Sequence, residues 1–505
     1  MPGGCVRFCA RRYRFLLLAI MIACGVLTTM SVGRLETIPR DVKGKEQPPV
    51  AAPTIRGDFA LENKNHTDLE NLHCPIGEFE CPCAKDRGCL SELECVGTPG
   101  VCKLRMGEPL TLMNDMRPKQ CLEPERAFFK AENVAKYRST SVVMCFHNED
   151  APSLNMSIRS LLHRTSPKLL VEILLVDDQN ENIPGVDVLH FPKVRMIRTP
   201  SRLGIAGCRM FGADYSVGDV IVFLDAHVEA GFGWLEPLQW TLLNKPNTLA
   251  TPIVENLKPD SRQWMPAGKP CGGLNFKTFH FEWTKTPKPC ALLFERDRRE
   301  AGMNESDIAK ETLAMHWADS YPSPTGPGGL YAVNREWWYK SGTYDEGMKI
   351  WGAENIEQAI RVWSCGGRID IVPCSHVGHV YRTSGQGFRF KFPKQKGTHQ
   401  TWKNTARAVA AWVEYPYLPV VKKLISHVKW DTDVGDISAR LQLKKDLQCH
   451  NFKWFVQNIF PDLHVQFRAA IAPKTTSPKA TPAGKSPMAW HKASKAHPGK
   501  SSAQS

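Results

Sequence analysis

Two residues with metal-binding side chains, Asp225 and His227, follow directly on a short apolar run, residues 220–224. Such a run is typical of a strand that is buried on both faces of a sheet. Because side chains alternate along an extended chain, the carboxylate and the imidazole would point the same way. An oxygen and a nitrogen ligand together suit Mn²⁺ or a similar ion better than Ca²⁺. The alternative interpretation is that Asp225 begins a turn and His227 is an ordinary loop residue.

Strand-like and helix-like segments alternate on both sides of this motif. Strands are expected at residues 139–146, 171–176, 194–197 and 219–224, and helices at residues 154–163 and 205–215. This alternation predicts an α/β fold with a mostly parallel sheet. Ligands of such sheets bind at the carboxyl ends of the strands. A ligand cleft is therefore expected around the polar residues that follow strand ends, which are His147, Asp177, Asp178, Asp225 and His227.

The second half of the chain continues the pattern less regularly. A Gly-Gly turn leads into a strand at residues 328–333, a helix is expected at 351–363, and strand-like runs follow at 369–373 and 374–382. Residues 382–402 are rich in Gly, Lys and aromatic side chains and have no clear period. This composition predicts a long loop, and loops of that length in compact domains often serve as lids.

The net charge of +14 over 505 residues could indicate a nucleic-acid partner. The excess charge lies largely at the two ends, and no nucleic-acid-binding motif is found between them. We therefore expect no nucleic acid, and interpret the basic surface as one that meets an anionic small molecule or a membrane.

The N-terminal segments indicate a single-pass type II membrane protein. Residues 15–32 form an uncharged apolar run near the lower length limit of a membrane span, and arginines precede it. We interpret residues 1–14 as a cytosolic tail, 15–32 as a signal anchor and 33–73 as a stem. A cleaved signal peptide is the alternative. A lumenal location would suit the seventeen cysteines and the glycosylation sequons at Asn65, Asn155 and Asn304.

Composition divides the remaining chain into three parts. Residues 74–103 hold six closely spaced cysteines, which predict a small module with three disulfides whose connectivity the sequence does not show. A zinc site is the competing interpretation of that module. Residues 104–471 carry the α/β pattern, and the Lys-, Pro-, Ser- and Thr-rich residues 472–505 have the composition of a disordered tail.

Several ordered motifs resemble those of the polypeptide N-acetylgalactosaminyltransferases, the Golgi enzymes that start mucin-type O-glycosylation. The resemblance covers roughly residues 121–463. It rests on the motifs SVVMCFHNE at 141–149, LVDD at 175–178, FLDAH at 223–227 with GWLEP at 233–237, WGAEN at 351–355, VGHVYR at 377–382 and DIS at 436–438.

The resemblance implies a GT-A type nucleotide-sugar-binding fold, UDP-GalNAc as donor, Ser/Thr-containing polypeptides as acceptors and Mn²⁺ as cofactor. It assigns the metal ion to Asp225, His227 and His379, and donor binding to His147, Asp178, Arg202, Arg209, Gly329 and Arg382. Catalytic positions are implied for Glu354 and Asn355, which match sugar contacts, and for Trp351, which matches an aromatic residue that moves with a lid. The family retains anomeric configuration, which implies attack by the acceptor hydroxyl on the face that the phosphate leaves.

The chain departs from the family pattern at several positions. Pro327 precedes the Gly-Gly turn where the family usually has Ala, Gly207 replaces a common arginine, and Cys145 replaces a small polar residue. The six-cysteine module is unusual for the family, and we expect the usual lectin domain to be missing. A transferase of another UDP-sugar and a non-catalytic lumenal binding protein therefore stay open as alternatives.

The resemblance also implies two disulfides, Cys121–Cys374 and Cys365–Cys449. Cys145 is expected to be a free thiol that is buried in a strand.

Overall fold

The structure is a computed structural model that describes residues 81–82, 93–96, 101–104, 116–122, 126–181, 191–258, 261–268, 270–275, 277–381 and 399–461, with 464 and 467. The expected tail, anchor and stem at residues 1–73, and the C-terminal tail at 472–505, lie outside these residues. Among the helices of the described part, none has the length and hydrophobicity needed to cross a membrane.

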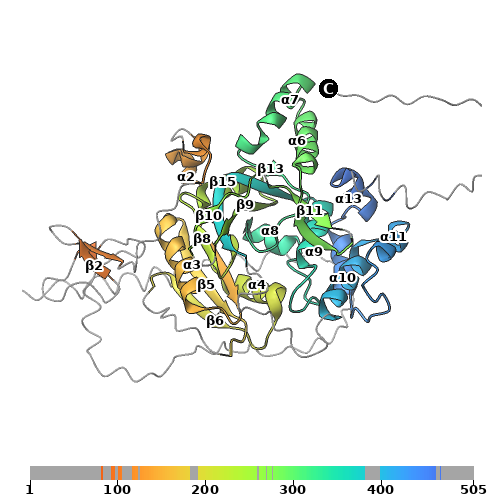
Figure 1. Ribbon diagram of the computed structural model, residues 1–505, viewed down its shortest axis with the longest axis horizontal. Coiled ribbons are helices and arrows are strands. Elements are labelled where there is room, and N and C mark those ends of the chain that lie inside the picture. Colours follow the sequence, from red (N-terminus) through yellow and green to blue (C-terminus); the bar gives the residue numbers. More distant parts are fainter. Residues whose placement is uncertain are drawn as a thin grey trace, which may run out of the picture. The chain divides into compact units, whose positions relative to one another are not determined.

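A ten-stranded sheet forms the centre of the catalytic-domain segment (Figure 1). Its main path has the order β13-β15-β9-β14-β7-β4-β5-β6, while β10 pairs with β9 and β8 pairs with β15. The strands are β4 (Thr140–Phe146), β5 (Leu170–Asp177), β6 (Val194–Arg198), β7 (Val220–Asp225), β8 (Val228–Ala230), β9 (Thr248–Leu257), β10 (Trp264–Met265), β13 (Tyr321–Pro322), β14 (Tyr331–Asn334) and β15 (Arg368–Val380).

The prediction of a mostly parallel sheet is wrong, because the sheet is mixed. β4 pairs in parallel with β5 and β7, β5 with β6, and β9 with β15. β14 runs antiparallel to both of its neighbours, β7 and β9, and β8, β10 and β13 also pair antiparallel. A short apolar run such as β14 has no signal of its direction, and only its pairing in the folded sheet decides it.

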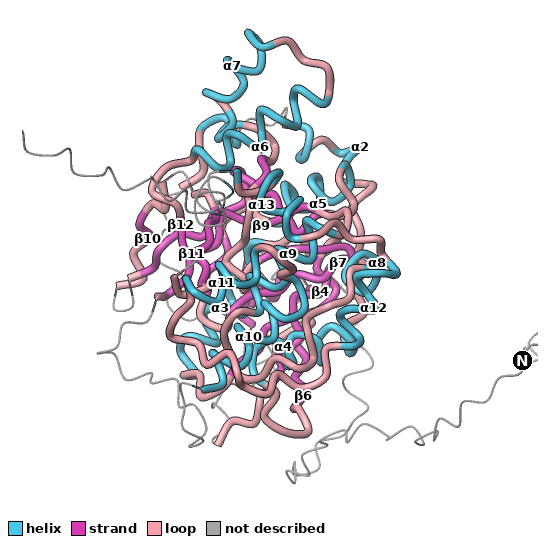
Figure 2. The backbone as a smooth tube through the Cα atoms, turned by 90° about the vertical axis from the view of Figure 1, so that its right-hand side faces the viewer, coloured by secondary structure: helices cyan, strands magenta, loops and turns pink. Residues whose placement is uncertain are grey.

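Helices cover both faces of this sheet. α3 (Ala151–Arg164) and α5 (Leu235–Asn244) pack on one face, and the other face is covered by α4 (Gly204–Tyr215), α8 (Arg335–Lys340), α9 (Glu354–Ser364) and α10 (His399–Trp412). Figure 2 views the molecule from the side of α9, α10 and α11 (Tyr417–Leu424). The other α-helices among the described residues are α2 (Ala131–Val134), α6 (Lys288–Glu300), α7 (Glu305–Leu313), α12 (Ser438–Asp446) and α13 (Phe452–Asn458).

Alternation along the strands decides which side chains meet which helices. In β7, Ile221 and Phe223 belong to the core beneath α4 and α9, whereas Val222 and Leu224 belong to the core beneath α3 and α5. Asp225 continues the first set, so its carboxylate leaves the sheet on the side of α4 and α9. A buried strand thereby places this polar residue at its carboxyl end and on a defined face.

All six elements expected from the sequence between residues 139 and 225 are present, with ends that differ by up to three residues. The strand-like runs at 369–373 and 374–382 form one strand, β15, which has an irregularity between Val372 and His376. Residues 382–398 of the predicted loop 382–402 lie outside the described residues. Its last four residues are helical, because α10 begins at His399.

Four disulfides are present in the described part of the domain. Cys121–Cys374 and Cys365–Cys449 confirm the pairs that the family resemblance implied. The others are Cys145–Cys208 and Cys271–Cys290. The prediction that Cys145 is a free thiol is therefore wrong. Cys145 lies on the face of β4 that α4 covers, and the packing of that helix brings Cys208 to it.

A separate three-stranded antiparallel sheet lies within the six-cysteine segment. It consists of β1 (Cys81–Pro82), β3 (Val101–Leu104) and β2 (Leu93–Val96), in that order. The three disulfides predicted for this module fall outside what the structure describes.

Candidate active site

A cavity of about 520 Å³ opens at the carboxyl ends of β4, β5 and β7. Of the twelve residues predicted for the site, ten line it: His147, Asp178, Arg202, Arg209, Asp225, His227, Gly329, Trp351, Glu354 and His379. Asn355 lies beside it, because a Cβ added to Gly328 in the cavity wall would lie 2.6 Å from the Asn355 Cβ. Arg382 lies outside the described residues.

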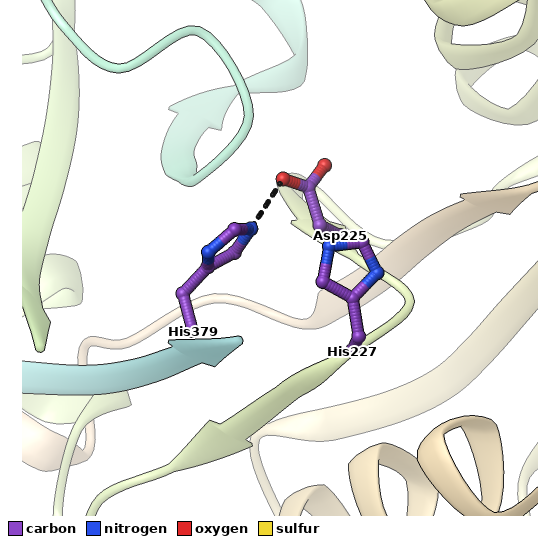
Figure 3. Close-up of side chains that lie close together, drawn as sticks. All are labelled: Asp225, His227 and His379. Atoms are coloured by element: carbon purple, nitrogen blue, oxygen red, sulfur yellow. Dashed lines mark hydrogen bonds and ion pairs between the residues drawn. The ribbon is translucent and has the colours of Figure 1, made fainter. Parts of the chain in front are cut away.

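Asp225, His227 and His379 form a compact cluster in this cavity (Figure 3). One ligand atom from each residue can be chosen so that all three lie within 4.8 Å of one another. Asp225 ends β7 and His227 lies just before β8. The antiparallel pairing of His379 with Val228 brings β15 beside them. A carboxylate with two imidazoles is a ligand set that fits Mn²⁺, and no ligand of the set requires a different metal.

A buried glutamate orients one of these histidines. The Nδ1–H of His227 donates to Oε2 of Glu149 at 3.0 Å, which leaves Nε2 of the ring as the atom that can bind a metal. The Glu149 side chain is only 3% exposed. The motif at residues 141–149 included Glu149, but its role was not predicted. Its position two residues after His147, just beyond the end of β4, was the available signal.

Arg209 forms an ion pair with the Asp225 carboxylate of this cluster. This buried guanidinium donates through Nη2 to Oδ1 of Asp225 at 2.9 Å and through Nη1 to the carbonyl oxygen of Gly328 at 2.6 Å. Burial alone would raise the pKa of Asp225. The hydrogen bond from His379 and the charge of Arg209 outweigh it, so that this pKa lies well below its usual range. Asp225 is therefore an anion at neutral pH, as a metal ligand must be.

The turn before β14 must come very close to this pair. A Cβ on Gly329 would lie 2.8 Å from Oδ2 of Asp225 and 3.0 Å from Nη2 of Arg209. Any larger residue at this position would displace the ion pair. Gly329 therefore matters through the space that it leaves for this ion pair.

Asp178 and His147 organise the opposite end of the cavity. The two carboxylate oxygens of Asp178 accept hydrogen bonds from the backbone N–H groups of Leu203 and Gly204, at 2.7 and 2.8 Å. His147 lies between the carbonyl oxygen of Asp178, 2.7 Å from Nδ1, and Nη1 of Arg202, 2.6 Å from Nε2. Because the carbonyl only accepts and the guanidinium only donates, His147 carries its proton on Nδ1.

Glu354 and Trp351 form the remaining wall. Glu354 is buried and its Oε2 accepts a hydrogen bond from the N–H of Gly352 at 2.7 Å. Burial raises the pKa of its carboxyl. Trp351 is 43% exposed, and its ring stacks on His280 with centroids 5.5 Å apart. An exposed indole at the mouth of a cavity can cover a ligand or contact a second substrate.

The fold is of the GT-A type that glycosyltransferases have. The family model described as glycosyl transferase family 2 matches residues 141–296, and the model described as the N-terminal domain of galactosyltransferase matches residues 311–384. The crystal structure of GalNAc-T7 with UDP, GalNAc and Mn²⁺ is similar, with a TM-score of 0.58 and 28% identity. That similarity covers 70% of this chain and 62% of the other.

Curated relatives agree with this class. Polypeptide N-acetylgalactosaminyltransferase 13 of Rattus norvegicus is 36% identical over 345 residues, which cover 65% of this chain and 56% of the relative. Polypeptide N-acetylgalactosaminyltransferase 4 of Caenorhabditis elegans is 33% identical over 358 residues, 71% of this chain and 56% of the relative. Over this segment the chain is similar to the polypeptide N-acetylgalactosaminyltransferases. It spans about half the length of these relatives.

Proposed function

We propose that this protein transfers GalNAc from UDP-GalNAc to Ser or Thr hydroxyls of polypeptides in a reaction that depends on Mn²⁺. The observation that carries the proposal is the cluster of Asp225, His227 and His379 within the cavity. The names of the relatives and the ligands of the similar GalNAc-T7 structure support the choice of donor and acceptor.

The charged residues of the cavity suit a diphosphate donor. Asp225, His227 and His379 would hold Mn²⁺, which when bound neutralises the charge that develops on the leaving diphosphate. Arg202 lies at the Asp178 end of the cavity, where its guanidinium can donate to phosphate oxygens in a fixed plane. Arg209 keeps Asp225 ionised and oriented. The protein thus mainly positions the substrates and stabilises charge.

Retention of configuration is proposed to proceed without a protein nucleophile. The carboxylates that line the cavity are those of Glu149, Asp178, Asp225 and Glu354. Each of them accepts a hydrogen bond from another group of the protein. We therefore propose that the acceptor hydroxyl attacks the anomeric carbon on the face that the diphosphate leaves, and that a departing phosphate oxygen takes its proton.

A transferase that uses another UDP-sugar is the second candidate. Pro327 lines the cavity immediately before Gly328 and Gly329, where the family usually has Ala. Its ring adds bulk at the sugar end of the site. The choice between hexosamines therefore depends on the shape of this wall.

We also propose that the protein is a single-pass type II protein of the Golgi membrane, anchored by residues 15–32, with its catalytic domain in the lumen. The apolar run at 15–32 and the arginines before it support this topology.

A donor panel with and without metal tests the proposed function. The full-length protein is incubated with Thr-containing peptides and UDP-GalNAc, UDP-GlcNAc, UDP-Gal or UDP-Glc, and the peptide mass is measured. We expect GalNAc transfer that EDTA abolishes and Mn²⁺ restores. Asp225→Asn, His227→Ala and His379→Ala should each abolish it, because each removes a metal ligand. Transfer by the wild type at full rate in EDTA would exclude this mechanism.

A further inference from the structure

The cavity wall that carries Trp351 has an unusual backbone. Ile350 and Ala353 have φ angles of 61° and 65°, and Gly352 between them has a φ of 109°. A β-branched residue such as Ile350 rarely adopts a positive φ, and such a conformation persists only where the surroundings impose it. The residues that hold the segment 349–353 in this shape therefore also shape the cavity.

One side chain accounts for most of the hydrogen bonds that hold this segment from outside. The Nδ2 of Asn404, in α10, lies 2.9 Å from the carbonyl oxygen of Lys349, 3.2 Å from that of Trp351 and 3.1 Å from that of Gly352. Its Oδ1 accepts from the N–H of Lys349 at 3.2 Å. Asn404 is 1% exposed, and Gln400 one turn earlier donates to the same Oδ1 at 2.8 Å, which fixes the orientation of the amide.

The segment 349–353 contacts residues on two sides of the cavity. The carbonyl oxygen of Ile350 accepts a hydrogen bond from the N–H of Ile205 at 2.8 Å, at the beginning of α4. Gly204 touches Ile350 so closely that an added Cβ would lie 2.2 Å from the Ile350 Cα. On the other side, the N–H of Gly352 donates to Glu354. The start of α4, which Asp178 holds, and the carboxylate of Glu354 thus both depend on the path of residues 350–352.

We propose that Asn404 is a positioning residue of the active site: it holds residues 349–352 in the path that needs positive φ angles at Ile350 and Gly352, and thereby sets the distance between the start of α4 and Glu354 across the cavity. Asn404 does not line the cavity, so it acts through the backbone that it binds. Removing its amide leaves three carbonyl oxygens without that donor, and the segment can relax away from α4. Its effect on donor binding rests on the proposed function, whereas its effect on the segment does not.

The test compares Asn404→Ala and Asn404→Asp with the same substitutions at Asn334. Asn334 is a suitable control because it is 6% exposed and its Nδ2 donates to the carbonyl oxygen of Pro246 at 2.9 Å. It also lies at the end of β14 that pairs with Val220, away from Asp225. Asn404→Asp keeps the volume and the Oδ1 acceptor but turns an anionic oxygen toward the three carbonyls.

Two readouts are measured on the full-length variants. Hydrogen exchange of the amides at residues 205 and 349–353 should become at least about tenfold faster in both Asn404 variants, because the bonds that protect these amides weaken. The KM for UDP-GalNAc and the Kd for UDP with Mn²⁺ should rise about tenfold, with a smaller change in kcat. The Asn334 variants should leave both readouts within about twofold of the wild type at a similar loss of thermal stability.

The outcomes separate the two proposals. Unchanged exchange at residues 349–353 in the Asn404 variants, or an equal change in the Asn334 variants, overturns the positioning role whatever the donor is. A wild type that does not bind UDP with Mn²⁺ contradicts the proposed function, while faster exchange in the Asn404 variants alone would still support the positioning role.

Discussion

At the scale of single residues, the candidate metal site depends on partners that are not themselves ligands. Arg209 fixes the carboxylate of Asp225, and Glu149 fixes the ring of His227. Such partners select the tautomer and the orientation of a ligand before a metal arrives. The cationic Arg209 also favours the anionic form of Asp225.

Glu149→Gln should weaken metal binding without removing a ligand. The amide oxygen of Gln can still accept from Nδ1–H of His227, but the negative charge behind the ring is lost. The Kd for Mn²⁺ in the presence of UDP should rise about 10- to 100-fold, measured by titration calorimetry. Glu172→Gln is the control, because Glu172 is also buried but pairs with Ser141 and Arg195 near the start of β5. Equal Mn²⁺ affinity of Glu149→Gln and the wild type would show that Glu149 has no role at the metal.

At the scale of elements, the second half of β4 is tied covalently to α4. The disulfide Cys145–Cys208 joins the strand two residues before His147 to the helix one residue before Arg209. Both cysteines line the cavity. Two elements that carry donor-side residues are therefore linked directly, in addition to their packing.

Loss of this disulfide should lower the free energy of unfolding and leave one free thiol. The bond closes a loop with a sequence separation of 63. In the chain-entropy model its removal in Cys145→Ser lowers the free energy of unfolding by about 4 kcal/mol. Mass spectrometry after alkylation in denaturant under non-reducing conditions should find Cys208 labelled in the variant and neither cysteine labelled in the wild type, because Cys208 is buried in the fold. An alkylated Cys145 in the wild type under these conditions would contradict the pairing.

The first part of β15 is stabilised by a buried carboxylate. Asp370 accepts hydrogen bonds from Nζ of Lys245 and Oγ of Ser320, both at 2.8 Å, and from Nε of Arg368 at 2.7 Å. Burial would raise its pKa, but the charges of Arg368 and Lys245 outweigh burial and lower the pKa from 3.8 to about 2. Because the folded pKa is depressed, this contribution to stability is present above pH 4 and is lost as the pH falls toward 2.

Asp370→Asn should therefore destabilise the protein in a way that depends on pH. The difference in free energy of unfolding between wild type and variant should shrink by about 2 kcal/mol between pH 5 and pH 2. Urea unfolding followed by circular dichroism at several pH values measures it. Asp319→Asn, which removes a carboxylate that is 44% exposed beside Arg126, should show a much smaller pH dependence. A difference for Asp370→Asn that is independent of pH would contradict the assignment.

At the scale of the whole molecule, the proposed lumenal topology has consequences for the three sequons. Asn304 is exposed at the N-terminus of α7, whereas Asn155 is partly buried within α3. After expression in a eukaryotic secretory pathway, we expect N-glycans on Asn65 and Asn304 and none on Asn155. Glycopeptide mass spectrometry before and after N-glycanase measures this. A protein whose mass does not change with the glycanase would argue against passage of the domain through the lumen.

Local patterns were sufficient for the parts of the site that lie close together in the chain. The alternation of side chains in an extended segment is a property of the backbone itself, so the common direction of Asp225 and His227 could be predicted from their spacing. The buried strands at residues 140–225 and the helices between them were likewise predictable, because their hydrophobic periods are local.

Tertiary structure decided everything that depends on which segments meet. His379 meets Asp225, which lies 154 residues earlier in the chain, only because β15 pairs with β8. Without the family resemblance it is an ordinary histidine in a strand. No local pattern predicts the antiparallel direction of β14 or the pairing of Cys145 with Cys208. The same is true of the hydrogen bonds between Asn404 and the backbone of residues 349–352. Sequence periodicity shows which face of a segment is buried. The packing of distant segments determines which side chains that face contacts, because the packing arrangement depends on the free energy of the whole core.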